Sequence, residues 1–138
     1  MAGFSKGKRE HKVKKERGMI VMSLFSQFEC KGDVLIVRLS GELDHHETER
    51  VKVMWQHHLN AKSVKHVIVN LEKLSFMDSS GLGVMLGRYK EIKYKGGQMV
   101  ICSISPQVKR LFDLSGLHKI VDFERDETAA LSRLGVAS

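Results

Sequence analysis

SFMDSSGLGVMLGRYK, residues 75–90, places an aspartate and two serines where a strand-like pattern gives way to a helical one. In an open α/β sheet, ligands and partners gather at the carboxyl ends of the strands, so this junction is the first candidate for a functional site. The simplest role of Asp78 or Ser79 is to cap the following helix. A hydroxyl at a helix N-terminus can also carry a phosphate, because the free N–H groups and the helix dipole favour negative charge there.

The residues upstream of this junction predict a hairpin and a helix. The stretch FSQFECKGDVLIVRLSG (25–41) contains two strand patterns that turn at residues 31–33. It is followed by ELDHHETERVKVMWQHHLN (42–60), which has apolar residues at helical spacing. Asp44 is the predicted N-cap of this helix, since Glu47 stands three residues later at the capping-box spacing.

The rest of the chain alternates between strand and helix patterns. A serine, a proline and a glycine at positions 105, 106 and 116 give one of the helices clear start and stop signals. The predicted order is ββαβαβαβα, and strands that alternate with helices imply right-handed crossovers. We therefore expect an α/β fold with a single, mostly parallel sheet, an N-terminal hairpin and helices packed on the sheet. The expected strands lie within 67–71, 98–104 and 118–124, and the expected helices within 79–96, 105–116 and 126–135.

The positive charge of the chain is concentrated at its N-terminus. The 138 residues carry a net charge of +7, of which residues 1–21 contribute +5. This segment has few apolar residues and no period, so we expect a basic, disordered extension followed by one domain over residues 22–138. Because the remaining chain is nearly neutral, it does not predict a specific nucleic-acid partner.

No apolar run approaches the roughly 20 residues that span a bilayer, and the basic start lacks the cleavage site of a signal peptide. The sequence therefore predicts a cytoplasmic protein without a membrane partner. Cys30 and Cys102 stand in strand patterns without CxxC spacing, so we expect a core thiol at each position.

The patterns of several enzymes and cofactor sites are missing. Neither serine of the junction lies in G-x-S-x-G, and Gly81, Gly83 and Gly87 are spaced one residue too far for a dinucleotide fold. Gly83 and Gly87 share one helix face, where we expect them to let the helix approach the sheet. The histidine pairs at 45–46 and 57–58 lie too far apart along one helix to share a metal ion. We expect no catalysis, cofactor or metal.

Three stretches resemble one known family. LSGELD (39–44), VIVNLEKLSFMDSSGLGVMLGRYK (67–90) and SPQVKRLFDLSGLHKIV (105–121) are similar to the bacterial anti-sigma factor antagonists of the STAS family. The resemblance runs from about Met22 to Ser138 and is greatest to the sporulation members, which release sigma F.

The resemblance implies a STAS fold and a function by partner exchange. In this family the unphosphorylated antagonist binds the ADP-bound form of an anti-sigma factor that is also a serine kinase, and so frees the sigma factor. The kinase, with ATP, phosphorylates the serine that follows the aspartate of the motif, and a PP2C-type phosphatase removes the phosphate. Carried over to this sequence, the phosphorylated residue is Ser79.

The same resemblance predicts the partner surface. Asp78, Ser80 and Gly81 flank the phosphorylated serine, and Asp44 is expected at the same end of the sheet. Two apolar residues of the following helix complete the predicted surface, although the sequence does not separate a core role from a partner contact for them: Leu82 and Met85. A STAS module of a sigma B or stressosome-like pathway and a nucleotide-binding STAS domain remain as alternatives.

Overall fold

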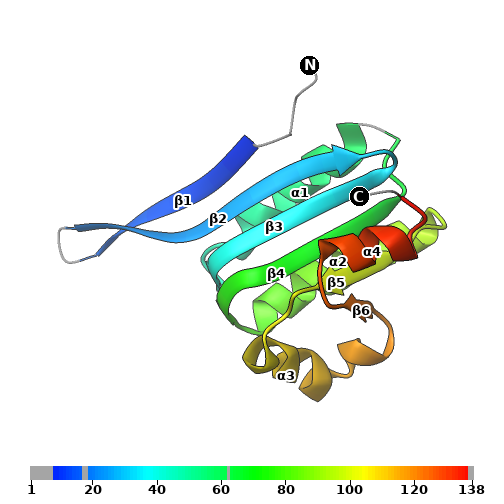
Figure 1. Cartoon of the computed structure of the whole chain (residues 1–138). Coiled ribbons are helices and arrows are strands. Elements are labelled where there is room, and N and C mark those ends of the chain that lie inside the picture. The colour runs from blue at the N-terminus through cyan, green and yellow to red at the C-terminus, as the bar shows by residue number, and fades with distance from the viewer. Residues whose placement is uncertain (1–7, 17–18, 62, 137–138) are drawn as a thin grey trace.

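The computed structural model describes residues 8–16, 19–61 and 63–136, and it contains one six-stranded sheet (Figure 1). The strands lie in the order β1-β2-β3-β4-β5-β6. The pairs β1–β2 and β2–β3 are antiparallel, and each later pair is parallel. The strands are β1 (Lys8–Glu16), β2 (Met19–Lys31), β3 (Val34–Leu43), β4 (His66–Met77), β5 (Met99–Cys102) and β6 (Asp122–Glu124).

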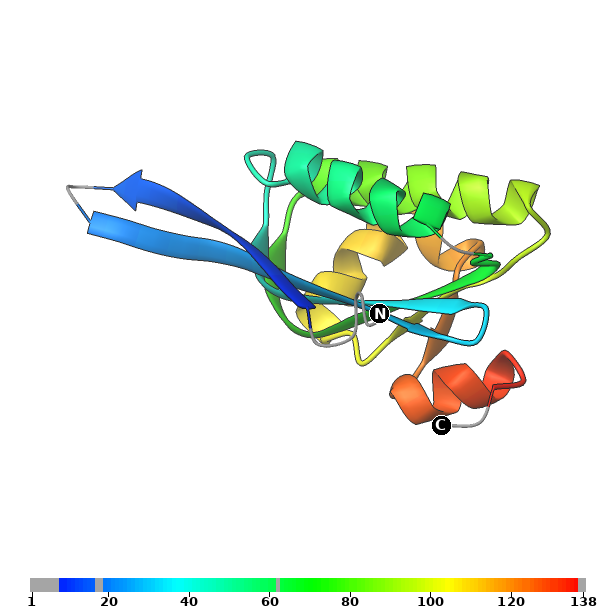
Figure 2. The same cartoon turned by 90° about the horizontal axis from the view of Figure 1, so that it is seen from above.

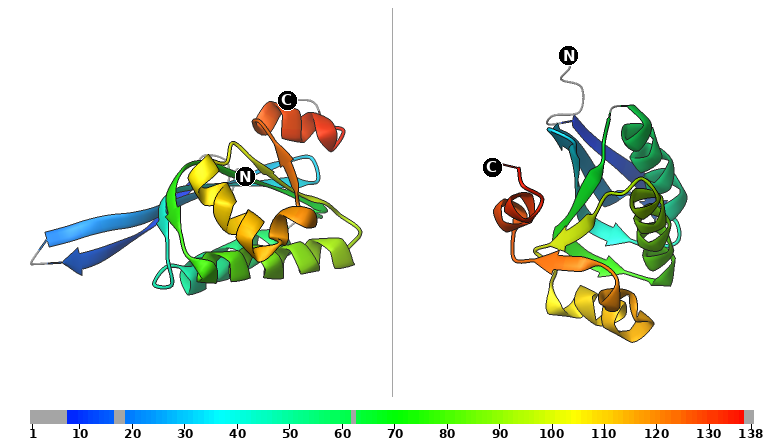
Figure 3. Two further views of the ribbon diagram at one scale, coloured as in Figure 1. Left: turned by 90° about the horizontal axis from the view of Figure 1, so that it is seen from below. Right: turned by 90° about the vertical axis from the view of Figure 1, so that its right-hand side faces the viewer.

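Helices cover both faces of this sheet. From β2 onward the elements follow the predicted order ββαβαβαβα, so the predicted fold class is confirmed. The helices α1, α2 and α3 lie on one face, and α4 lies on the other (Figures 2 and 3). The helices are α1 (Thr48–Ala61), α2 (Ser79–Tyr94), α3 (Pro106–Ser115) and α4 (Glu127–Arg133), with a 3-10 turn η1 (Leu117–Lys119) after α3.

The sheet separates two apolar clusters of unequal size. The larger cluster joins the sheet to α1, α2 and α3 and includes Trp55, which is fully buried. The smaller cluster joins β3, β4 and β5 to α4 through Ala130 and Leu131. This division follows from the period of two in the strands, because successive residues such as Leu35 and Ile36 point to opposite faces.

Strand β1 corrects the expectation of disorder in the N-terminal segment. It pairs with β2 from Lys8↔Phe28 to Glu16↔Met19, and the far part of this ribbon projects away from the sheet (Figures 1 and 2). Composition predicts whether a segment has an apolar face, but a strand also forms by pairing its backbone with a neighbour. Residues 19–21 of the predicted extension belong to β2, and residues 1–7 and 17–18 lie outside the described residues.

Two glycines close the turns at the ends of α2. A Cβ on Gly81 would lie 2.4 Å from Cγ of Met77, so a larger residue there would displace the Met77 side chain between α2 and the end of β4. A Cβ on Gly97 would lie 1.7 Å from the carbonyl oxygen of Lys65, which fixes the turn into β5. By contrast, a Cβ on Gly83 or Gly87 would meet no atom of a described residue within 4 Å. The expectation that these two glycines bring α2 close to the sheet is therefore wrong.

Candidate functional site

The carboxyl ends of β3 and β4 bring two aspartates to one edge of the sheet. Leu43 pairs with Met77 in the last register position, and Asp44 and Asp78 follow directly. The N–H of Asp78 also donates to the carbonyl oxygen of Leu43 across 3.3 Å. We call residues 78–81 the Asp78 motif. The structure thus places Asp44 at the same end of the sheet as the Asp78 motif, as the sequence predicts.

Asp78 caps α2 and is held by several donors. Its carboxylate accepts hydrogen bonds from the backbone N–H groups of Ser80 and His45, each across 3.0 Å, and from the Ser80 hydroxyl. Burial acts to raise the pKa of Asp78, but these hydrogen bonds outweigh it and hold the pKa below its usual value of 3.8. The edge therefore carries a negative charge at neutral pH.

The two serines after Asp78 differ in their surroundings. The hydroxyl of Ser80 is half-buried and donates to the Asp78 carboxylate. Ser79 is the first residue of α2 and is exposed, and its hydroxyl makes no hydrogen bond to any described residue. Of the two hydroxyls, the one at Ser79 is therefore accessible to an enzyme that modifies serine.

The residues around Asp44 form a turn rather than the start of a helix. The Asp44 carboxylate accepts from the N–H of His46 across 2.9 Å, and α1 begins only at Thr48. The prediction of Asp44 as the helix N-cap is wrong, because Glu47 is not available for a capping box. The Glu47 carboxylate is buried, and it accepts hydrogen bonds from the Ser23 hydroxyl and from Arg50.

The apolar residues near the motif divide between core and surface. Met85, predicted to contact a partner, is fully buried in the larger cluster, and we correct that prediction to a core role. Leu82 is half-buried and packs against the same cluster. Phe76, which the sequence analysis missed, is 45% exposed two residues before Asp78. The sequence signal that could have identified Phe76 is an aromatic residue at an outward-facing position near the end of a strand pattern.

The sequence raises only metal binding as a role for His45, and rejects it. In the structure, His45 contacts the Asp78 motif. Its N–H donates to Asp78, and its ring Nδ1 lies 3.6 Å from the same carboxylate. No sequence signal connects residues that lie 33 positions apart across two loops. Among the residues that the structure describes, no three side chains of the metal-binding types gather at one point.

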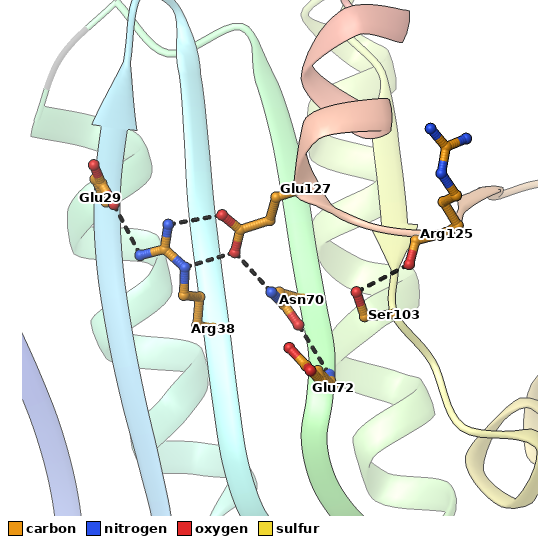
Figure 4. Close-up of polar contacts among 7 residues, drawn as sticks. All are labelled: Glu29, Arg38, Asn70, Glu72, Ser103, Arg125 and Glu127. Carbon is orange, nitrogen blue, oxygen red and sulfur yellow. Dashed lines mark hydrogen bonds and ion pairs between the residues drawn. The ribbon is translucent and has the colours of Figure 1, made fainter. Parts of the chain in front are cut away.

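The face of the sheet that α4 covers carries a second polar cluster, formed by Glu29, Arg38, Asn70 and Glu127 (Figure 4). We call this cluster the Arg38 clamp. Arg38 donates to both oxygens of Glu127, across 2.6 and 2.8 Å, and lies 2.8 Å from Glu29. Asn70 donates to Glu127 across 2.7 Å. The hydrogen bond from Arg38 lowers the pKa of the Glu127 carboxyl despite burial, and Glu127 in turn raises the pKa of Arg38.

Three residues of the Arg38 clamp, namely Arg38, Asn70 and Glu127, line a hollow of about 640 Å³ beside the start of α4. The charged groups of the clamp are paired with one another, whereas Glu72 and Lys73 line the same hollow without an ion pair to any described residue. The clamp ties α4, through Glu127, to the neighbouring strands β3 and β4. Within the described ranges, no helix is long and apolar enough to cross a membrane.

Comparisons with known proteins agree on one family. The STAS domain family matches residues 26–130. An anti-sigma F factor antagonist of Paenibacillus polymyxa is 48% identical over 117 residues, which cover 85% of this chain and 100% of the relative. An anti-sigma-B factor antagonist of Listeria monocytogenes is 32% identical over 98 residues, which cover 69% of this chain and 82% of the relative.

Solved structures show the same fold. The anti-sigma factor antagonist SpoIIAA in its unphosphorylated form is similar with a TM-score of 0.65 and 31% identity, covering 80% of this chain and 97% of that one. The Bacillus cell fate determinant SpoIIAA in the phosphorylated form gives a TM-score of 0.64 and 34% identity, covering 79% and 98% of the two chains.

Proposed function

The chain belongs to the STAS domain family as an anti-sigma factor antagonist, and from this premise we propose that its unphosphorylated form captures an ADP-bound anti-sigma factor kinase. Capture releases sigma F in the cytoplasm and switches on sporulation transcription. Phosphorylation of Ser79 by the same kinase ends the capture, and a PP2C-type phosphatase restores it. The STAS domain that does this spans residues 22–138, and the chain has no catalytic role in the cycle.

The exposed, unbonded hydroxyl of Ser79 is the observation that carries this proposal. A kinase must reach its substrate hydroxyl, and Ser80 offers a hydroxyl that already donates to Asp78. A phosphate on Ser79 would sit at the N-terminus of α2, where the helix dipole tolerates negative charge. The fold therefore has no need to reorganise when the phosphate is added.

Binding and phosphorylation are coupled through charge. A phosphate adds about −1.5 to −2 charges at pH 7 beside an edge that already carries Asp78 and Asp44. A partner that covers this edge would bury an unpaired charge, which weakens a complex by several kcal/mol. The surface that the partner covers comprises Asp44, Asp78, Ser79, Ser80, Gly81 and Leu82.

The direct test is to incubate the protein with a purified anti-sigma F factor and ATP, and to map the modified residue by mass spectrometry. We expect phosphate on Ser79 in the wild type and none in Ser79→Ala, while Ser80→Ala is still modified. Phosphate on Ser80 in the wild-type protein would contradict the assignment.

A sigma B pathway is the second candidate, because the Listeria relative is an anti-sigma-B factor antagonist. The two candidates differ in the partner that they require. Parallel titrations with an anti-sigma F factor and an anti-sigma B factor, each with ADP, separate them, and we expect the tighter complex with the anti-sigma F factor.

A further inference from the structure

A narrow groove lies between α1 and α2, next to the Asp78 motif. Thr48, Glu49 and Lys52 of α1 line one side of it, and the α2 side begins at Ser80. Its volume is about 270 Å³. This is smaller than the roughly 300–1,000 Å³ of most small-molecule pockets, and it suits a single side chain of a protein. We call it the α1–α2 groove.

Gly83 and Gly87 leave this groove open on the α2 side. Glycine inside a helix lowers the stability of the helix relative to alanine, so a glycine at such a position calls for a structural or a functional reason. Neither glycine has a positive φ, and a Cβ on either would meet nothing within 4 Å in the part of the chain that the structure describes. Gly81, in the same helix, differs because a Cβ there would collide with Met77. The fold thus gives a reason for Gly81 but none for the two glycines of the groove.

Arg88 lines the same groove and is only partly paired. The residue is 9% exposed, and its Nη1 has no hydrogen-bond partner among the described residues. Its Nε lies 3.5 Å from Glu91, whose carboxylate also accepts from Gln56 across 2.7 Å. A buried guanidinium with free N–H groups is unfavourable until an acceptor arrives. The groove therefore contains a cation that lacks part of its hydrogen bonding.

We propose that the α1–α2 groove receives an acidic side chain of the anti-sigma factor, whose carboxylate pairs with Arg88. Guanidinium and carboxylate groups form paired, charge-assisted hydrogen bonds, and Lys52 adds a second positive charge against the one carboxylate of Glu49. The absence of side chains on Gly83 and Gly87 lets the partner's chain approach closely. The inference rests on the proposed function, and it extends the partner surface from Ser80 along α2.

The first test fills the groove without disturbing the fold. Gly83→Ala and Gly87→Ala are titrated against the ADP-bound anti-sigma F factor of Paenibacillus polymyxa, with Lys93→Ala as an exposed control on α2 outside the groove. We expect both glycine variants to lose about tenfold or more in affinity, with melting temperatures at or above that of the wild type, and the control to bind normally. If both variants bind like the wild type, the groove is empty in the complex and the inference is wrong, while the proposed function stands.

The second test asks for the carboxylate. Arg88→Met keeps the length and burial of the side chain but removes its charge, and we expect a loss of affinity of about tenfold without a fall in melting temperature. Normal binding by Arg88→Met, together with weak binding by the glycine variants, would show an uncharged occupant and overturn the proposal. A wild-type dimer in sedimentation that Gly83→Ala disrupts would make the occupant a second copy and overturn it as well. If the wild type itself fails to bind the kinase, the proposed function fails first and this inference falls with it.

Discussion

The Asp78 motif and the Arg38 clamp are both polar clusters on the same sheet, but they use their hydrogen bonds differently. In the clamp, Arg38 and Glu127 satisfy each other, and the cluster joins strands to a helix. In the motif, Asp78 accepts from backbone N–H groups and from Ser80, and the hydroxyl of Ser79 stays accessible. The difference indicates that a polar cluster closed on itself stabilises the fold, whereas one that leaves a reactive group exposed is suited to regulation.

The comparison predicts its largest effect at Ser79. Phosphorylation there should weaken capture of the ADP-bound kinase by about a hundredfold or more, because the partner would bury an unpaired double charge. Ser79→Asp should weaken it less, since a carboxylate has about half the charge of a phosphate. Titration calorimetry of the three forms measures the order.

The same experiment tests whether the switch is local. High salt should restore only part of the lost affinity, because bulk and desolvation are not screened. The melting temperatures of the phosphorylated and unphosphorylated proteins should be similar. A shift of several ångströms in α2 or in the Asp44 turn on phosphorylation would show a conformational switch instead.

The second prediction concerns the Arg38 clamp, where we expect a substitution to change the stability of the fold and not the binding of the kinase. Arg38→Met should reduce the free energy of unfolding by about 2 kcal/mol, because it leaves Glu29 and Glu127 as unpaired carboxylates in a partly buried site. Binding of the kinase should be unchanged. Arg133→Met is the matched control, since the pairs of Arg133 with Asp122 and Glu124 lie at the surface and should contribute no more than about 1 kcal/mol each. Urea unfolding and titration of both variants measure the contrast, and lost kinase binding in Arg38→Met would show that the clamp also serves the partner.

The local signals in the sequence predict more of the molecule than the long-range ones. Ser105 caps α3 and Gly116 ends it with a positive φ, because caps depend on residues within one turn. The contact between Arg38 and Glu127 spans 89 positions, and no pattern in the sequence reports such a pair. The prediction that Gly83 faces the sheet is wrong for a related reason. Helical spacing shows which residues share a face of the helix, but not which face lies on the sheet.

The candidate site follows the same division. The cap at Asp78 and its closeness to Asp44 could be predicted, because both residues follow neighbouring parallel strands. The burial of Met85 could not, since a helix beside a sheet edge presents apolar residues both to the core and to the surface. The contact of His45 with Asp78 depends on the path of the loop after β3, which the sequence does not specify.

The third prediction concerns the acid stability that the Arg38 clamp contributes. Arg38 holds the pKa of Glu127 below its usual 4.5, so the folded state favours the ionised carboxylate. The stability from this pair is complete above pH 4.5 and is lost as the pH falls through the lower, folded-state pKa. Urea unfolding of the wild type between pH 7 and pH 3 should therefore show a decline at the acid end. Glu127→Gln should be less stable at neutral pH and decline less steeply, and an equal slope in both proteins would contradict the assignment.

The smallest effect is expected from the removal of strand β1. Its principal contacts are with β2, and β2 residues 19–23 lie before the first pair with β3, Leu24↔Gly41. Removing residues 1–21 therefore deletes the projecting ribbon and the pairs of residues 8–12 with β2 residues 24–28, but it keeps every pair between β2 and β3. The backbone groups that this exposes can bond to water, so we expect the free energy of unfolding to fall by no more than about 1 kcal/mol, with unchanged affinity for the kinase. Thermal unfolding and titration of the shortened chain check this. A loss of several kcal/mol would show that the domain begins before residue 22, and weaker binding with normal stability would place β1 in the partner surface.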